Sequence, residues 1–228
     1  PGGTVISSDT INNLSPNTPQ IISVSVTPNN QSVVTFAPST SPQTTHYILY
    51  YYLSNGPAIA WDTVYGINNT IVIDTTTSHI HDPTQFSQIF TVGAVDSCGD
   101  RSSFNTSPQN TILAAAANTE CQRQVNITWN KYNNWPSGVA EYQIWVSKNG
   151  GAFAEDGFTD STVLDYAYTN FNTGDTLQIY VLATSAADTN IVSRSNLIQL
   201  KAIIVQPPTY IYLTNVKVNE ENQIFMTW

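Results

Sequence analysis

Few residues of this sequence have the type and spacing that chemistry needs. His79 and His81 stand two positions apart in the stretch SHIHD, and at that spacing two imidazoles share one side of an extended strand, as two zinc ligands could. No third ligand follows nearby, and no serine or cysteine is spaced as the nucleophile of a histidine–aspartate relay. We therefore expect a loop at this stretch, with no metal site and no catalytic residue.

Two groups of acidic residues are the next candidates for a site. They comprise Asp96 and Asp100 in one stretch, and Glu155, Asp156, Asp160 and Asp165 in another. Calcium takes roughly six to eight oxygen ligands, which surface loops can supply, but neither spacing is that of an EF-hand. Solvated turns are the simpler interpretation. No glycine-rich phosphate loop or paired-carboxylate motif indicates a cofactor.

The two cysteines, Cys98 and Cys121, are too few for a disulfide scaffold and do not have the spacing of a CxxC metal or redox motif. One disulfide formed in an oxidising compartment is the first interpretation. Two unrelated small core residues are the alternative.

Aromatic residues in loops could bind a ligand. Trp135 lies in the stretch YNNWPSG between two expected strands, where an exposed ring could stack on a sugar or anchor a protein partner. Packing of the ring across its own loop is the alternative and is favoured. Trp61 is a second aromatic residue of this kind.

Charge and hydropathy exclude two classes of partner. The net charge is −9 with 7 Lys and Arg residues, whereas binding to nucleic-acid phosphates needs a basic patch. No apolar run reaches the roughly 18–20 residues of a membrane-spanning helix. We therefore expect neither nucleic-acid binding nor membrane insertion.

The elements that would position these residues are short strands, and they recur. Runs of Val, Ile, Thr and aromatic residues, broken by Asn, Gly, Pro and Ser, predict an all-β protein. The stretch QVNITW at residues 124–129 recurs as QIFMTW at 223–228, and residues 33–36 hold the equivalent place earlier. Phe36, Trp129 and Trp228 stand 93 and 99 residues apart. Repeats of this length with about seven short strands are typical of β-sandwiches.

The repeat divides the chain into four parts. Residues 1–17 are expected to be the tail of a preceding unit with its linker, and residues 18–113 and 114–205 to be two complete sandwiches. Residues 206–228 are expected to begin a further repeat.

Period-two alternation predicts which side chains face each core. The inward set of the first unit is Val34, Phe36, Tyr47, Leu49, Tyr51, Phe90, Val92 and Ala94. That of the second is Val125, Ile127, Trp129, Tyr142, Ile144, Val146, Ile179, Val181 and Ala183. The opposite faces carry a further apolar set, expected to be covered by a neighbouring domain or a partner: Ile48, Tyr50, Tyr52, Ile89, Trp145, Tyr180 and Leu182.

The strand around Trp129, the stretch EYQIWV (141–146) and the stretch IYVLA (179–183) resemble strands B, C and F of a fibronectin type III domain, over about 190 residues of the chain. The resemblance implies tandem immunoglobulin-like, fibronectin type III β-sandwiches. Gln88 and Leu177 stand where many such domains have the tyrosine of the tyrosine corner.

A narrower resemblance lies at the junction of the two units. The stretch AVDSCGDRS (94–102), the later Cys121 and the stretch YNNWPSGV (132–139) with Tyr142 are similar to fibronectin-type-III-like repeats of gliding-motility-associated surface proteins exported by the type IX secretion system. The resemblance implies a non-catalytic spacer in a large secreted protein at the cell surface. It also implies contact with the secretion machinery and a link to gliding or adhesion. The alternative is a carbohydrate- or protein-binding module that uses the loop aromatics.

The cysteines connect this resemblance to the arrangement of the units. Cys98 is expected between strands F and G of the first unit, and Cys121 just before strand B of the second. In a straight string of domains these positions are far apart, whereas a disulfide needs Cα atoms within about 7 Å. A Cys98–Cys121 bond therefore requires either that the two sandwiches fold back side by side or that the first strand of the second unit departs from its usual path.

Overall fold

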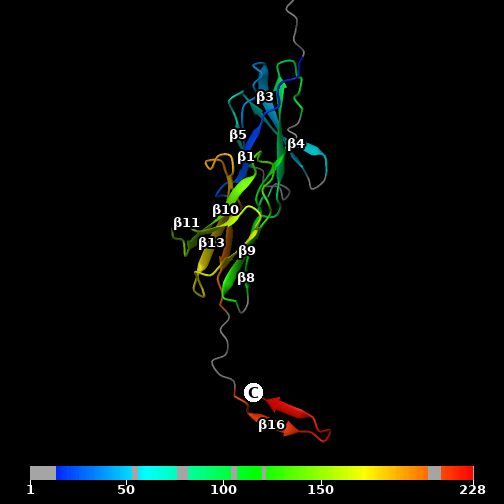
Figure 1. The fold of residues 1–228 in the computed structure, drawn as a ribbon. Helices are drawn as coiled ribbons and strands as arrows, with labels where there is room; N and C mark the ends of the chain where they lie inside the picture. Colours follow the sequence, from blue (N-terminus) through cyan, green and yellow to red (C-terminus); the bar gives the residue numbers. More distant parts are fainter. Residues whose placement is uncertain are drawn as a thin grey trace, which may run out of the picture.

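The computed structural model describes residues 14–52, 56–75, 82–103, 107–119, 122–204 and 212–227 of the chain. His79, His81, Cys121 and Trp228 lie outside the described residues, as does most of the tail expected at residues 1–17. All regular elements of the described part are strands (Figure 1). No helix in that part is long and apolar enough to cross a membrane.

The first sandwich is made of two antiparallel sheets. One sheet has the order β1-β2-β5 and the other the order β4-β3-β6-β7. The strands are β1 (Ile21–Val26), β2 (Ser32–Phe36), β3 (Thr44–Tyr52), β4 (Ala58–Tyr65), β5 (Ile71–Ile73), β6 (Ile89–Asp96) and β7 (Gln109–Asn110).

The second sandwich repeats this plan. One sheet has the order β12-β9-β8, and the other has the order β11-β10-β13-β14, with β15 also paired to β13. The strands are β8 (Ala114–Thr119), β9 (Gln124–Trp129), β10 (Val139–Lys148), β11 (Ala154–Asp160), β12 (Asp165–Tyr168), β13 (Thr176–Ser185), β14 (Val192–Arg194) and β15 (Ile198–Lys201). A separate hairpin follows, formed by β16 (Asn215–Val218) and β17 (Ile224–Thr227).

Alternation along the strands forms the two cores. All residues of both predicted inward sets are buried, which confirms the predicted register. They fall into two separate clusters, one in each sandwich. Aromatic pairs fill the centres: Phe36 packs edge-on against Tyr47 with ring centroids 4.9 Å apart, and Trp129 lies 5.5 Å from Tyr142.

The predicted outward apolar set is largely covered within the chain. Ile48 and Tyr50 are 8% and 6% exposed and form a small cluster with Val95, separate from the main core of the first sandwich. Tyr52, Ile89, Trp145, Tyr180 and Leu182 are half-buried.

The connection between the sandwiches is short. β7 ends at Asn110 and β8 begins at Ala114, and between them Thr111 and Ile112 are completely buried. Ile112 belongs to the core of the second sandwich. The connecting residues are therefore packed as interior residues.

Candidate functional site

The most elaborate arrangement of polar side chains in the described residues is the joint between the two sandwiches. There the free edge of β1, in the first sandwich, lies against β14 of the second. In Figure 1 the blue strand β1 stands beside the orange segment that leads out of β13. Each strand covers an edge that would otherwise expose unpaired backbone groups.

Tyr132 lies at the centre of the joint. It is 1% exposed, and its hydroxyl donates to Oε1 of Gln109 at 2.6 Å. The Tyr132 hydroxyl oxygen in turn accepts the N–H of Val24 at 2.8 Å. The Gln109 amide donates in turn to the carbonyl of Ile21 at 3.0 Å. Burial raises the pKa of the Tyr132 hydroxyl well above its ordinary value. The phenol is therefore a neutral group with both hydrogen-bonding functions satisfied.

Trp135 lies next to Tyr132 and faces the first sandwich. It is 5% exposed, its ring centroid is 4.2 Å from that of Tyr132, and its indole N–H donates to the carbonyl of Ile22 at 2.8 Å. Of the two interpretations of this ring, the packed one describes it, although the ring packs on the first sandwich as well as on Tyr132 of its own loop. The structure places Trp135 in the joint, because the first sandwich supplies both the apolar surface and the acceptor that the indole needs.

Arg194 closes the opposite side of the joint. Its Nη1 donates to the carbonyl of Thr27 at 3.0 Å and lies 3.4 Å from that of Val26, and its backbone N–H donates to Oγ of Ser25 at 2.9 Å. Burial lowers the pKa of the guanidinium, and the Tyr180 ring beneath it opposes this effect. Because the chain carries few basic residues, a half-buried one whose guanidinium bonds the neighbouring sandwich indicates a specific structural role.

A ladder of rings connects Arg194 to the outer face of the second sandwich. The Arg194 guanidinium lies 4.2 Å from the centroid of the Tyr180 ring, and Tyr180 is stacked on Trp145 at 6.0 Å with an interplanar angle of 4°. Phe153 packs against Tyr180 at 5.0 Å. The Arg194 guanidinium and the Trp145 ring thus both pack against the Tyr180 ring, and these contacts hold the guanidinium against the first sandwich.

Further bonds cross the joint on both sides of Tyr132. Ser193 Oγ donates to the carbonyl of Val24 at 2.7 Å, and the N–H of Leu197 donates to Oδ1 of Asn30 at 2.7 Å. Near the connection, Asn110 Oδ1 accepts the N–H of Asn133 at 2.9 Å, and the Asn110 amide donates to the carbonyl of Lys131 at 3.0 Å. The two sandwiches are therefore held together by residues 22–30 and 109–110 of the first and by residues 131–135 and 193–197 of the second.

Sequence reasoning identified Trp135, Trp145 and Tyr180 but missed Tyr132, Arg194 and Asn110. These three act between sandwiches and belong to no periodic pattern. The available signals were local: a loop with the two large aromatic residues Tyr132 and Trp135, and an arginine inside an otherwise uncharged strand.

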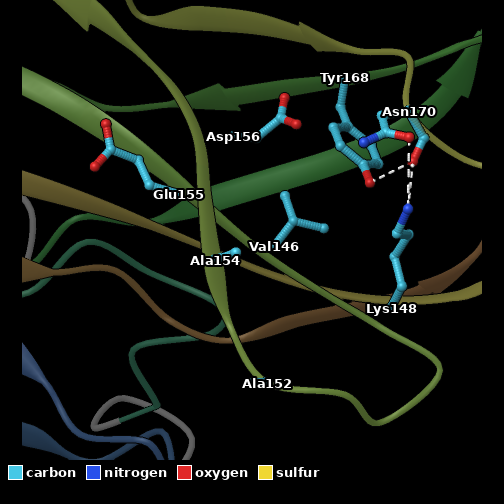
Figure 2. A pocket seen from close by; sticks show the side chains of 8 residues that line it. All are labelled: Val146, Lys148, Ala152, Ala154, Glu155, Asp156, Tyr168 and Asn170. Carbon is cyan, nitrogen blue, oxygen red and sulfur yellow. Dashed lines mark hydrogen bonds between the residues drawn. The ribbon is translucent and has the colours of Figure 1, made fainter.

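A cavity of about 310 Å³ opens at the edge of the second sandwich, between β11 and β12 (Figure 2). In Figure 2, Lys148 and Tyr168 both point to Asn170, and Glu155 and Asp156 lie on β11. Lys148 Nζ donates to the Asn170 carbonyl at 3.2 Å, and the Tyr168 hydroxyl donates to the same oxygen at 2.6 Å. Burial is the main cause that raises the pKa of Tyr168 to about 12. Both of these donors of the cavity are thus satisfied by the Asn170 carbonyl, so they hold the sandwich edge together.

Of the acidic residues expected in turns, Asp96 and Asp160 do bond turn backbone, whereas Glu155 and Asp156 lie within β11 and Asp165 begins β12, so the expectation is wrong for these three. Asp96 Oδ1 accepts the N–H groups of Cys98 and Asp100, both at 2.9 Å, and Asp160 Oδ1 accepts the N–H of Thr162 at 3.1 Å. Within the described ranges no three metal-ligating side chains gather. The bonds that Asp96 and Asp160 accept from the backbone N–H groups just after them are those of Asx turns.

Cys98 is exposed at the F–G turn of the first sandwich, and within the described residues its thiol is not part of a disulfide. This turn follows Asp96, whereas the other end of β6, at Ile89, pairs with Asn110 beside the joint. Cys98 therefore lies at the end of the first sandwich remote from the second. Because Cys121 is outside the described residues, the Cys98–Cys121 bond stays a prediction.

No protein-family model and no curated protein sequence matches the chain. Among solved structures, the FN1–FN3 domains of chicken CNTN1 are similar at 16% identity, over 83% of this chain and 68% of that chain, with a TM-score of 0.35. Fold class follows instead from the strand orders, in which a three-stranded antiparallel sheet faces a four-stranded one in the first unit and a five-stranded one in the second, around one core in each unit. The chain is a tandem of immunoglobulin-like β-sandwiches.

Proposed function

We propose that the chain is a rigid, non-catalytic spacer in a large secreted protein, whose two sandwiches are fixed at one relative orientation. The observation that carries this proposal is the joint, where Tyr132, Trp135 and Arg194 of the second sandwich each bond the backbone of the first. A buried connection at residues 111–113 leaves no length of chain to act as a hinge.

The finer part of the proposal concerns export and location. Residues 94–102 and 132–142 carry the resemblance to type IX-secreted, gliding-associated repeats, and they form the F–G turn of the first sandwich and the core of the joint. We propose a cell-surface location for the parent protein, export by the type IX machinery, and a role that supports gliding or adhesion. The neighbouring domains of the same chain are the partners with which these sandwiches make contact.

The competing interpretation, a carbohydrate-binding module, has less support. Stacking on a sugar needs an aromatic face open to solvent, yet Trp135 is buried and Tyr180 is sandwiched between Trp145 and Arg194. The aromatic residues that suggested binding are used inside the chain.

Distance measurement between the sandwiches tests the rigid joint. Spin labels at the exposed positions Asn68 and Gln199, with both native cysteines replaced by serine, should give one narrow distance distribution. Arg194→Ala combined with Asn30→Ala should broaden it, and the surface control Lys201→Ala should leave it unchanged. A broad distribution in the parent chain would refute the spacer.

Export is tested on intact cells that express the full-length parent protein. External protease should digest these sandwiches when the type IX machinery is present. In a strain without the machinery, the protein should remain protected inside the cell. Digestion that is equal in both strains would exclude this export route while leaving the rigid joint untouched.

A further inference from the structure

Three hairpins of the chain are related by the repeat, and two of them share one turn. In the first, Thr27 N donates to the Gln31 carbonyl at 2.8 Å, Asn30 N donates to the Thr27 carbonyl at 2.9 Å, and the Thr27 hydroxyl accepts Gln31 N at 3.1 Å. The hairpin of β16 and β17 repeats each bond with Asn219, Asn222 and Gln223, at 3.0, 3.1 and 2.8 Å.

Backbone conformation and register agree with this equivalence. Asn30 and Asn222 both have a positive φ, of 57° and 62°. The last strand pairs, Val26 with Ser32 and Val218 with Ile224, enclose residues 27–31 and 219–223. In the second sandwich the last pair is Thr119 with Gln124, which encloses the shorter segment 120–123. The third hairpin therefore has the same turn length and backbone conformation as the first hairpin, and differs from the second.

The faces of the third hairpin agree as well. Val216 and Val218 lie opposite Met226 and Ile224, and these four side chains are 52–63% exposed. The first two correspond to Val24 and Val26, which are buried in the first sandwich. The hairpin thus has an apolar face of the kind that a sandwich core covers, and its turn lies outside that face.

In the first sandwich this turn is the surface that receives the second. The Thr27 carbonyl accepts Arg194, and Asn30 Oδ1 accepts the backbone of Leu197. The third hairpin presents the equivalent acceptors on Asn219 and Asn222, with Glu220 and Glu221 exposed beside them. These carboxylates complement an arginine. Lys217 stands in place of Ser25, so the bond from Arg194 N to Ser25 Oγ has no counterpart there.

We propose that the turn at residues 219–223 is a docking surface for a further sandwich of the second kind, one that carries an arginine in the place of Arg194. The structural period of the protein is then a pair of sandwiches. Within a pair the connection is short, as at residues 111–113 between β7 and β8. This inference rests on the proposed rigid joint.

Exchange of turn residues in the full chain tests the docking surface. The variant Thr27→Asn/Pro28→Glu/Asn29→Glu gives the first turn the residues of the third hairpin. The matched control Asn30→Arg introduces the residue of the second sandwich's turn. With labels at Asn68 and Gln199, the first variant should keep the narrow distance distribution of the parent, and the control should lose it.

Any other combination of distance distributions for these two variants contradicts the proposed docking surface. If both variants broaden the distribution, or if both keep it narrow, the third turn is not equivalent to the first as a docking surface. A thermal melt of each variant shows whether the first sandwich is folded, and Thr27→Asn alone serves if the triple variant is not. A parent chain with a broad distribution would refute the rigid joint itself, which distinguishes the two failures.

Discussion

At the scale of the residue, Trp129 fills the core of the second sandwich with a large apolar ring that also carries an unpaired N–H group. It is 6% exposed, and among the described residues its indole N–H has no hydrogen-bond partner. Trp129→Ala leaves a cavity and should lower the free energy of unfolding by about 3–5 kcal/mol. Trp129→Phe should cost clearly less, because it keeps most of the packing and removes the unpaired donor. Denaturant unfolding of the two variants side by side measures the difference.

Tyr132 should make stability depend on alkaline pH. Its pKa is raised in the folded state by burial, whereas an unfolded tyrosine titrates near about 10. The stabilisation from the neutral phenol is therefore complete below about pH 10 and is lost as pH rises further, since only the unfolded chain releases its proton.

Other tyrosines of the chain, such as Tyr166 and Tyr168, also have raised pKa values, so the parent alone does not isolate this effect. The slope of unfolding free energy against pH above about 10 should be shallower in Tyr132→Phe than in the parent. Equal slopes would show that the buried phenol does not retain its proton.

At the scale of the element, the edge of the second sandwich depends on a glycine. A Cβ added to Gly157 in β11 would stand 2.6 Å from the hydroxyl of Tyr166 in β12, which donates to Asp156 at 2.9 Å. Gly157→Ala should displace that hydroxyl, break the bond and destabilise the second sandwich modestly, by about 1 kcal/mol. Gly151→Ala, in the preceding turn, is the comparison variant. A Cβ added there would stand 3.2 Å from the Lys148 carbonyl oxygen, a less close approach than the 2.6 Å at Gly157.

Elements also show what the sequence could predict. Alternation in strands such as β9 and β13 is set by local burial, so Val125, Ile127 and Ile179 were assigned correctly from pattern alone. The contact of β1 with β14 was not predictable in this way. It joins residues about 170 positions apart through side chains that each look ordinary in their own strand, such as Ser25 and Ser193.

At the scale of the whole molecule, the joint should make the two sandwiches unfold together. Contacts from Tyr132, Trp135 and Arg194 are lost when either sandwich unfolds, so each stabilises the other. Calorimetry of the parent should show one transition whose calorimetric and van't Hoff enthalpies agree for the two sandwiches as a unit.

Weakening the joint should separate that transition. Arg194→Ala removes a charged hydrogen bond and a cation–π contact, together worth about 2–3 kcal/mol. Combined with Tyr132→Phe, it should resolve two transitions, with Lys201→Ala as the unchanged control. Two transitions in the parent itself would mean that the joint holds orientation without coupling stability.

The position of β1 has a consequence for a chain under tension. A pull on the residues before Thr18 enters the fold through β1, which is bonded to β2 on one edge and covered by β14 of the next sandwich on the other. The load is thus divided between two bodies before any strand can be peeled away, and bonds along β1 are sheared together rather than opened one after another. A string built this way passes traction from one sandwich to the next without lengthening.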